Sequence, residues 1–152
     1  MPLVEQAIAS NRAYAEQFGV TFVLERVAPG VIIPTDSDRL MQVLNNLLAN
    51  AAKFSPPGGI VLVDVSRRED VLRIAVTDRG PGIPVEFRSR IFQKFAQADS
   101  SDTRQKGGTG LGLSIAKAIV ERLGGRIGYE TEIDVGSTFF VDLPLFDDKV
   151  TR

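Results

Sequence analysis

The chain has 152 residues, a formal net charge of −1 and 43% apolar residues. This length fits one domain, and the apolar fraction is enough for a hydrophobic core, which excludes disorder as the main state. Cysteine and histidine are absent, so the chain itself contains no disulfide, thiol nucleophile, imidazole-ligated zinc or histidine acid–base catalyst. The balanced charge indicates no nucleic-acid partner. No apolar run is long enough to span a membrane, and the N-terminus lacks a signal-peptide pattern, so we expect a cytoplasmic domain.

The spacing of apolar residues predicts helices and strands in a defined order. In chain order these are a helix over 3–18, a strand over 20–27, a helix over 38–54, strands over 60–66 and 71–78, helices over 85–95 and 111–123, and strands over 126–131 and 137–143. Residues 67–70 are polar and predict a hairpin turn. The order predicts an α/β (α+β) two-layer sandwich: a mixed, mostly antiparallel sheet with helices on one face. We assign residues 1–146 to this domain and 147–152 to a polar tail.

One long segment carries no periodic pattern. Residues 96–109 contain almost no apolar side chains between the third and fourth predicted helices. A stretch of this length without structure is uncommon inside a compact domain and is typically a functional lid.

The helix over 38–54 carries two stripes. The apolar stripe predicts the core-facing side, and the polar stripe lies nearly opposite. The polar stripe permits two interpretations, a solvated face or a binding site. Asparagine is a poor helix former, its carbonyl oxygen is a suitable Mg²⁺ ligand, and lysine supplies a charge for phosphate, which favours the site. The apolar stripe consists of Leu40, Leu44, Leu47, Leu48 and Ala51, and the polar stripe of Gln42, Asn46, Asn50 and Lys53.

Asp78 ends the strand over 71–78 and is predicted to point inward. Side chains alternate along a strand, so Asp78 shares a face with Leu72, Ile74 and Val76. An inward carboxylate requires a hydrogen-bond donor. That donor is either the turn at Gly80, which Asp78 would cap, or the amine of a bound ligand. The adjacent glycines predict a backbone that a flat ligand can approach closely.

A glycine-rich segment over 107–113 precedes the last predicted helix. Glycines allow backbone N–H groups to crowd around an anion, and a helix N-terminus adds positive potential. The segment lacks the Gly-Lys-Ser/Thr ending of a Walker A loop, and no strand precedes it as in a dinucleotide fingerprint.

These motifs together resemble one family, the catalytic ATP-binding domain of bacterial sensor histidine kinases in the gyrase, chaperone, histidine kinase and mismatch-repair ATPase superfamily. The resemblance runs from about Asp38 to Pro144, and more loosely back to Leu3. Five segments carry it in the expected order: residues 46–54 are similar to the N box, 78–83 to the G1 box, 91–95 to the F box, 108–113 to the G2 box and 136–140 to the final strand entry.

The resemblance implies a site for ATP and Mg²⁺ between the helix over 38–54 and the lid. It implies that Asp78 binds the adenine amino group, that Asn50 ligates Mg²⁺, and that Asn46 and Lys53 lie near the phosphates. Asn46, Asn50 and Lys53 are thus the implied catalytic residues. Phe92 and Phe95 are expected to anchor the lid by packing, with a purely core role as the alternative. The further implied nucleotide contacts are Phe54, Gly80, Gly82, Ile83, Arg104, Lys106, Gly108, Thr109, Gly110, Leu111, Gly112, Leu113 and Thr138.

One position favours phosphoryl transfer over hydrolysis. Hydrolytic members of the superfamily carry glutamate four residues before the Mg²⁺-binding asparagine, where this chain has Asn46. An amide cannot deprotonate water. The resemblance therefore implies a protein-histidine kinase of a two-component system, with γ-phosphate transfer to a histidine on a separate dimerisation domain. A response-regulator receiver domain would act downstream. The isolated domain is expected to be monomeric, and a membrane anchor in a longer protein is compatible with this assignment.

Two alternatives use the same nucleotide site. One is a regulatory module that binds nucleotide without transferring phosphate. The other is a serine-directed anti-sigma kinase, against which the segment with Phe92 and Phe95 and the long lid both argue.

Overall fold

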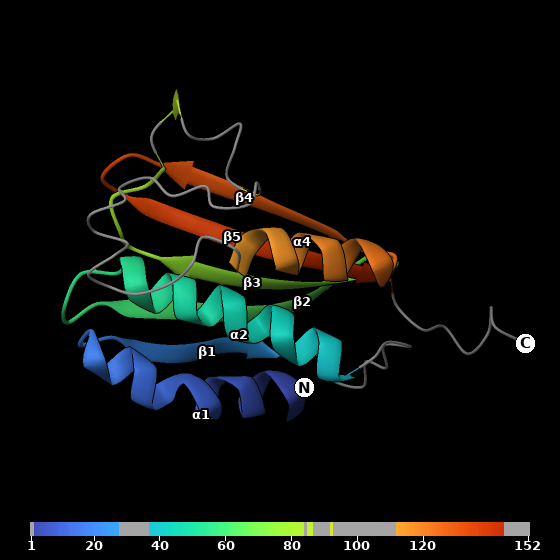
Figure 1. Cartoon of the computed structure of the whole chain (residues 1–152), viewed down its shortest axis with the longest axis horizontal. Helices are drawn as coiled ribbons and strands as arrows, with labels where there is room; N and C mark the ends of the chain where they lie inside the picture. Colours follow the sequence, from blue (N-terminus) through green and yellow to red (C-terminus); the bar gives the residue numbers. More distant parts are fainter. Residues whose placement is uncertain (1, 28–36, 84, 87–91, 93–111, 145–152) are drawn as a thin grey trace, which may run out of the picture.

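The computed structural model describes residues 2–27, 37–83, 85–86, 92 and 112–144. Figure 1 shows the helices and strands within these ranges. Their bounds are α1 (Pro2–Gln17), β1 (Thr21–Val27), α2 (Ser37–Phe54), β2 (Ile60–Arg68), β3 (Val71–Asp78), α4 (Gly112–Arg122), β4 (Arg126–Glu132) and β5 (Gly136–Pro144).

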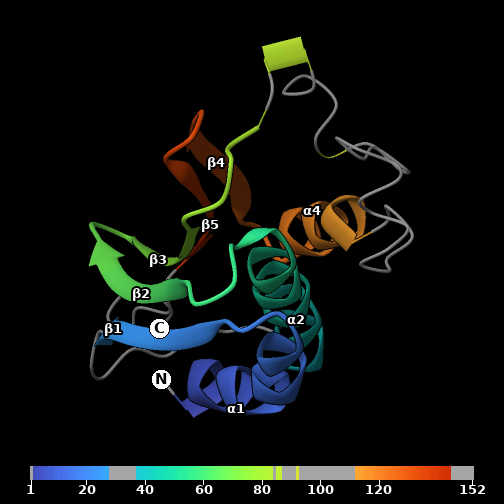
Figure 2. The same ribbon diagram turned by 90° about the vertical axis from the view of Figure 1, so that its left-hand side faces the viewer.

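The strands form one mixed sheet in the order β1-β2-β3-β5-β4. β1 and β2 are parallel because α2 carries the chain back between them, and the other neighbours are antiparallel. Figure 2 shows α1, α2 and α4 on the same side of the sheet. The predicted fold class, a two-layer α/β sandwich with a mostly antiparallel sheet, is confirmed.

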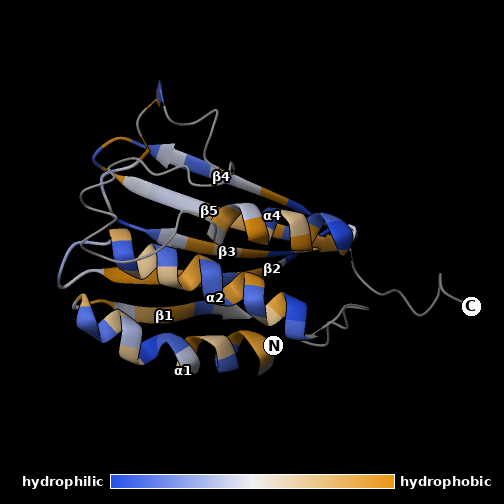
Figure 3. Cartoon of the chain, in the orientation of Figure 1, coloured by the Kyte–Doolittle hydropathy of each residue, from blue (hydrophilic) through white to orange (hydrophobic). Residues whose placement is uncertain are grey.

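The core lies between this helix layer and the sheet. All five residues of the predicted apolar stripe on α2 are at most 5% exposed, so the predicted core face is confirmed. Val61, Val63 and Val65 of β2 belong to the same buried cluster, together with Leu72 and Ile74 of β3. In Figure 3, β1 and β2 are largely orange, whereas α1 and α2 carry both blue and orange residues. This contrast is expected where each helix has one buried side and one side in water.

Two predicted details differ from the structure. β2 continues through Arg67 and Arg68, so the hairpin turn consists of residues 69–70 alone. Charged side chains are compatible with an exposed strand end, which the sequence pattern did not distinguish from a turn. Ile115, expected on the buried side of α4, is 37% exposed, because Ala116, Ile119 and Val120 form the contact. Most of the segment predicted as a helix over 85–95 lies outside the described residues, which include only 92 and residues 85–86 in a short 3₁₀ turn.

The segments predicted as lid (96–109) and tail (147–152) lie outside the described residues. No described helix is long and apolar enough to cross a membrane.

Candidate functional site

Asp78 has the inward orientation predicted for it. Leu72, Ile74, Val76 and Asp78 are all buried on the side of β3 that faces the helices, and Asp78 is 6% exposed. The amide of Gly80 donates a hydrogen bond of 2.9 Å to Oδ1 of Asp78. Asp78 therefore does cap the turn, as one interpretation required. A carboxylate has about four acceptor positions, so this bond leaves capacity for a ligand.

The electrostatic environment of Asp78 is unusual for an aspartate. Burial raises the pKa of its carboxyl above the ordinary value, and backbone hydrogen bonds from Gly80 and Ser137 lower it by less. Desolvation thus dominates over stabilisation by donors. A hydrogen-bond donor on a ligand would offset this desolvation, which is the behaviour expected at a binding site.

The glycines after Asp78 allow a close approach of backbone to backbone. A Cβ on Gly80 would lie 2.4 Å from the carbonyl oxygen of Phe54 at the end of α2. Gly82 has φ +83°, and a Cβ there would lie 2.6 Å from the carbonyl oxygen of Glu132. The segment over 80–83 is therefore wedged between α2 and the β4–β5 turn. These glycines were expected to admit a flat ligand, but the described contacts show that the chain's own backbone occupies the space beside Gly80 and Gly82.

The polar stripe of α2 divides into two parts. Gln42 is exposed, as a solvated face requires, but Asn46 and Asn50 are half-buried and Lys53 is only 8% exposed. Lys53 Nζ lies 5.1 Å from the centroid of the Phe54 ring. A fully solvated face is therefore excluded for the C-terminal half of the stripe. This half ends at Lys53, next to Phe54, whose carbonyl oxygen lies against Gly80 in the segment after Asp78.

The donor set of this half fits a magnesium ion that is held mainly by phosphates. Within the described residues, no three Asp or Glu side chains are grouped to hold a metal ion. Mg²⁺ commonly uses one or two protein oxygens together with water and substrate phosphates. The amide oxygen of Asn50 can supply one such ligand.

The β3–β5 register places Thr138 away from Asp78. Thr77 pairs with Thr138 and Asp78 pairs with Ser137. The hydroxyl groups of Thr77 and Thr138 form a hydrogen bond of 2.8 Å on the face of the sheet opposite the helices. The side chain of Thr138, implied as a nucleotide contact, thus points away from Asp78, because alternate residues of a strand face opposite sides. Ser137, which no sequence pattern singled out, pairs with Asp78 instead and is 6% exposed.

Of the other implied nucleotide contacts, Ile83, Gly112 and Leu113 lie within the described residues. Ile83 is buried, and its amide donates a hydrogen bond of 2.9 Å to Oγ1 of Thr131. Leu113 packs against the core near the start of α4. Gly112 is the first residue of that helix. Arg104, Lys106, Gly108, Thr109, Gly110 and Leu111 lie outside the described residues.

Phe92 packs against the sheet, which fits both an anchoring residue and the purely core alternative. Its ring centroid lies 6.0 Å from that of Tyr129 on β4 and 6.3 Å from that of Phe139 on β5. These separations are typical of favourable aromatic pairs. Phe95 lies outside the described residues.

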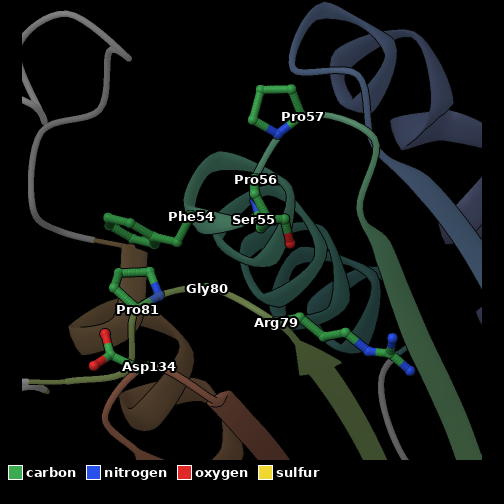
Figure 4. A pocket seen from close by; sticks show the side chains of 8 residues that line it. All are labelled: Phe54, Ser55, Pro56, Pro57, Arg79, Gly80, Pro81 and Asp134. Atoms are coloured by element: carbon green, nitrogen blue, oxygen red, sulfur yellow. The ribbon is translucent and has the colours of Figure 1, made fainter.

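A groove adjoins the end of α2 (Figure 4). Its volume is about 330 Å³. Phe54 and Gly80 belong both to this groove and to the implied nucleotide site, whereas Asp78, Asn50 and Lys53 do not line it. The groove is thus a neighbour of the candidate site. Its lining consists of Phe54, Ser55, Pro56, Pro57, Arg79, Gly80, Pro81 and Asp134.

Comparison with known proteins identifies sensor histidine kinases as relatives. The chain is 50% identical over 110 residues to the sensor histidine kinase AruS of Pseudomonas aeruginosa. The matched region covers 70% of this chain and 11% of AruS. It is 38% identical over 132 residues to the sensor histidine kinase WalK of Bacillus subtilis, covering 86% of this chain and 22% of WalK. The chain therefore spans only about a tenth to a fifth of the length of these two relatives.

Solved structures show the same fold. The mycobacterial sensor histidine kinase MprB superposes with a TM-score of 0.80 at 28% identity, over 95% of this chain and 93% of that one. Full-length ShkA, solved in complex with AMPPNP, superposes with a TM-score of 0.82 at 32% identity, over 95% of this chain and 29% of that one.

A family model agrees with both comparisons. The model of histidine kinase-, DNA gyrase B- and HSP90-like ATPases matches residues 35–147, which include α2, the whole antiparallel part of the sheet and Asp78. The chain therefore belongs to the family of histidine kinase-, DNA gyrase B- and HSP90-like ATPases.

Proposed function

We propose that this chain is the catalytic domain of a bacterial protein-histidine kinase, which binds ATP with Mg²⁺ and transfers the γ-phosphate to a histidine on a dimerisation domain. The observation that carries the proposal is Asp78. It is a buried carboxylate at the end of β3, with hydrogen bonds from two backbone amides and a pKa raised by desolvation. The adenine amino group is a donor that suits its remaining acceptor positions.

The half-buried stripe of α2 is proposed to hold the triphosphate. Asn50 would supply an amide oxygen to Mg²⁺, which neutralises phosphate charge when bound. Lys53 would place its ammonium near a phosphate, and Asn46 would donate or accept hydrogen bonds beside it. Phosphoryl transfer requires mainly positioning and charge neutralisation, and these residue types supply both.

The chemistry of Asn46 supports transfer rather than hydrolysis. A general base must accept a proton from water, and the neutral amide of Asn46 cannot do so at physiological pH. The nucleophile must therefore bring its own reactivity, as a histidine imidazole does. This chain contains no histidine, so the acceptor must lie on another domain.

The proposal extends to partners and location. The histidine-containing dimerisation domain of the same kinase would be the immediate partner, and a response-regulator receiver domain would take the phosphate next. We further propose a cytoplasmic location, no nucleic-acid partner and a monomeric state for the isolated domain.

Phosphate transfer to a supplied acceptor tests the proposal. The chain is incubated with γ-labelled ATP and Mg²⁺, with and without a histidine-containing dimerisation domain from a related kinase at high concentration. We expect label on the acceptor domain only, sensitive to acid as phosphohistidine is, and its loss with Asp78→Asn.

Two outcomes would contradict the proposal. ATP binding without transfer to any related acceptor domain would favour the regulatory nucleotide-binding module. Acid-stable label on this chain alone would favour serine or threonine chemistry.

A further inference from the structure

One hydroxyl group ties three segments together beside Asp78. Oγ1 of Thr131 on β4 accepts a hydrogen bond of 2.9 Å from the amide of Ile83, in the segment after β3. It also lies 2.8 Å from Oγ of Ser137 on β5 and 3.3 Å from the carbonyl oxygen of Gly136. A hydroxyl has one proton and two acceptor positions, so these contacts use nearly all of its hydrogen-bonding capacity.

The partners of Thr131 are the groups that shape the surroundings of Asp78. The backbone amide of Ser137 hydrogen-bonds the Asp78 carboxylate, and Asp78 and Ser137 are paired across β3 and β5. Ile83 lies at the end of the segment over 80–83. The amide of Gly80, at the start of this segment, also donates a hydrogen bond to Asp78. We call the backbone of residues 80–83 and Ser137 the frame around Asp78, because its amides donate to the carboxylate. Thr131 contacts both parts of this frame but has no described contact with the carboxylate itself.

We infer that Thr131 is a positioning residue for nucleotide recognition: its hydroxyl holds Ile83 and Ser137 so that Asp78 meets the amino group of adenine. The inference rests on the proposed function, since it assumes that Asp78 is the adenine anchor. Without the hydroxyl, the segment over 80–83 loses its described side-chain bond to β4, and Ser137 loses its hydroxyl partner. A displaced frame would weaken the directional hydrogen bond between Asp78 and the adenine amino group most. It would weaken stacking on the base and contacts to the phosphates least.

The chain contains a matched control. Thr77 and Thr138 form a second hydroxyl pair of the same length, 2.8 Å, between β3 and β5. This pair lies on the opposite face of the sheet, and Thr77 is next to Asp78 in sequence. Thr77→Val therefore removes a comparable hydrogen bond from β3, the strand that carries Asp78, but leaves the frame around Asp78 intact.

The test measures base recognition on the whole chain. Dissociation constants are determined by calorimetry for ATP with Mg²⁺ and for purine riboside triphosphate, which carries hydrogen in place of the amino group. We expect Thr131→Val to weaken ATP binding about five- to tenfold and purine riboside triphosphate binding by less than about twofold. The preference for ATP should thus fall in Thr131→Val, whereas Thr131→Ser and Thr77→Val should keep it.

A purely structural role gives a different result. In that case Thr131→Val and Thr77→Val would lower the melting temperature alike and leave the same preference for ATP, which would overturn the inference. If Thr131→Val fails to fold by circular dichroism, Ser137→Ala removes the same hydroxyl pair from the other side. An unchanged preference in Ser137→Ala would then overturn the inference.

The failure of the proposed function is distinguishable from these results. If the wild-type chain shows no preference for ATP, or if Asp78→Asn leaves ATP affinity unchanged, the adenine anchor itself is wrong and the inference fails with it. If Asp78→Asn weakens ATP binding but Thr131→Val keeps the preference, only the role of Thr131 is wrong.

Discussion

Asp78 is the residue where stability and binding oppose each other. Its buried carboxylate has a raised pKa, so the charged form is less favourable in the ligand-free fold than in the unfolded chain. Asp78→Asn keeps the acceptor for the amide of Gly80 and removes the charge. We therefore predict that Asp78→Asn raises the free energy of unfolding of the ligand-free protein while it weakens ATP binding about ten- to a hundredfold.

Urea denaturation and calorimetry check both halves of this prediction. Asp70→Asn, in the exposed hairpin turn, is the control and should change neither quantity. Loss of stability together with unchanged ATP affinity would mean that Asp78 serves the fold alone.

Glu69 is a residue whose backbone conformation does not suit its side chain. It has φ +55° in the two-residue turn between β2 and β3, and non-glycine residues are unfavourable in this region. We predict that Glu69→Gly stabilises the protein by ~0.5–1 kcal/mol in urea denaturation, because glycine adopts positive φ without a steric penalty.

The next residue of that turn provides the control. Asp70 is not among the described residues with positive φ, so Asp70→Gly only adds freedom to the unfolded chain. It should be neutral or destabilising. Equal stabilisation by both glycines would contradict the conformational explanation for Glu69.

At the scale of elements, α2 joins the core to the proposed phosphate site. Its apolar stripe is buried, and its polar stripe changes from exposed at Gln42 to half-buried at Asn50. We predict that Asn50→Ala reduces Mg²⁺-dependent ATP binding and slows phosphate transfer by about tenfold or more, since removal of one metal ligand weakens charge neutralisation. Titration of Mg²⁺ at fixed ATP measures the change.

Gln42→Ala is the control on the same stripe of the same helix, two turns before Asn50. It should leave the Mg²⁺ requirement unchanged. An equal effect of the two substitutions would indicate a general effect on α2 and remove Asn50 from the proposed metal site.

The strands on the helix-free face are joined by a network around Asp142. Arg73 of β3 donates hydrogen bonds of 2.7 and 2.8 Å to the two carboxylate oxygens of Asp142 on β5, and Arg126 of β4 lies 3.4 Å from one of them. The Arg73 guanidinium lies 3.9 Å from the centroid of the Phe140 ring. A Cβ on Gly128 would lie 2.5 Å from that ring, so this glycine makes room for the stack.

We predict that Asp142→Asn destabilises the protein by ~2–3 kcal/mol, because it leaves the partly buried Arg73 without its charge-assisted bidentate partner. Chemical denaturation measures this change. The exposed pair Lys117–Glu121 on α4 provides the comparison, and Glu121→Gln should change stability by less than ~0.5 kcal/mol. A small effect of Asp142→Asn would mean that water replaces the lost bonds.

At the scale of the whole molecule, two buried carboxylates give opposite pH dependences. The hydrogen bond from Arg73 lowers the pKa of Asp142, so its contribution to stability is present above the unfolded-state pKa and is lost as pH falls through the lower folded value. The raised pKa of Asp78 has the reverse sign. Its destabilising effect is present above the folded pKa and disappears as pH falls toward the unfolded value.

We therefore predict that the stability difference between Asp78→Asn and wild type is largest near neutral pH and shrinks on acidification. The same titration should show ATP affinity falling as Asp78 becomes protonated, at a higher pH than an ordinary aspartate would produce. Unfolding curves and binding isotherms between pH 4 and 8 measure both trends. A stability difference that is constant over this range would contradict the assigned pKa direction.

The elements of this fold were predictable because local patterns specify them. Period-two alternation in residues 71–78 predicted both the strand and the inward side of Asp78, and helical spacing predicted the buried stripe of α2. The end of β2 was misplaced because charged residues occur both in turns and at exposed strand ends. Ile115 was misplaced because helical spacing alone does not say how wide the contact of α4 is.

The candidate site was only partly predictable. Asp78 and Asn50 were singled out because each breaks a local expectation, a carboxylate on a core face and an amide in a helix. Lys53 was singled out because it shares the polar stripe of Asn50. Ser137 and Thr131 break no such expectation. Their places beside Asp78 depend on the pairing of β5 with β3 and with β4, which involves residues about sixty and six positions apart.

The amino-acid order was sufficient for the fold class, the core face of α2 and the inward direction of Asp78, because periodicity acts within one element. The strand register could not be predicted in this way, since no local pattern in the sequence identifies which residues pair across two strands. A shift of one residue reverses every side chain. That register turns Thr138 away from Asp78, places Ser137 beside it, and brings the hydroxyl of Thr131 within hydrogen-bonding distance of two other segments.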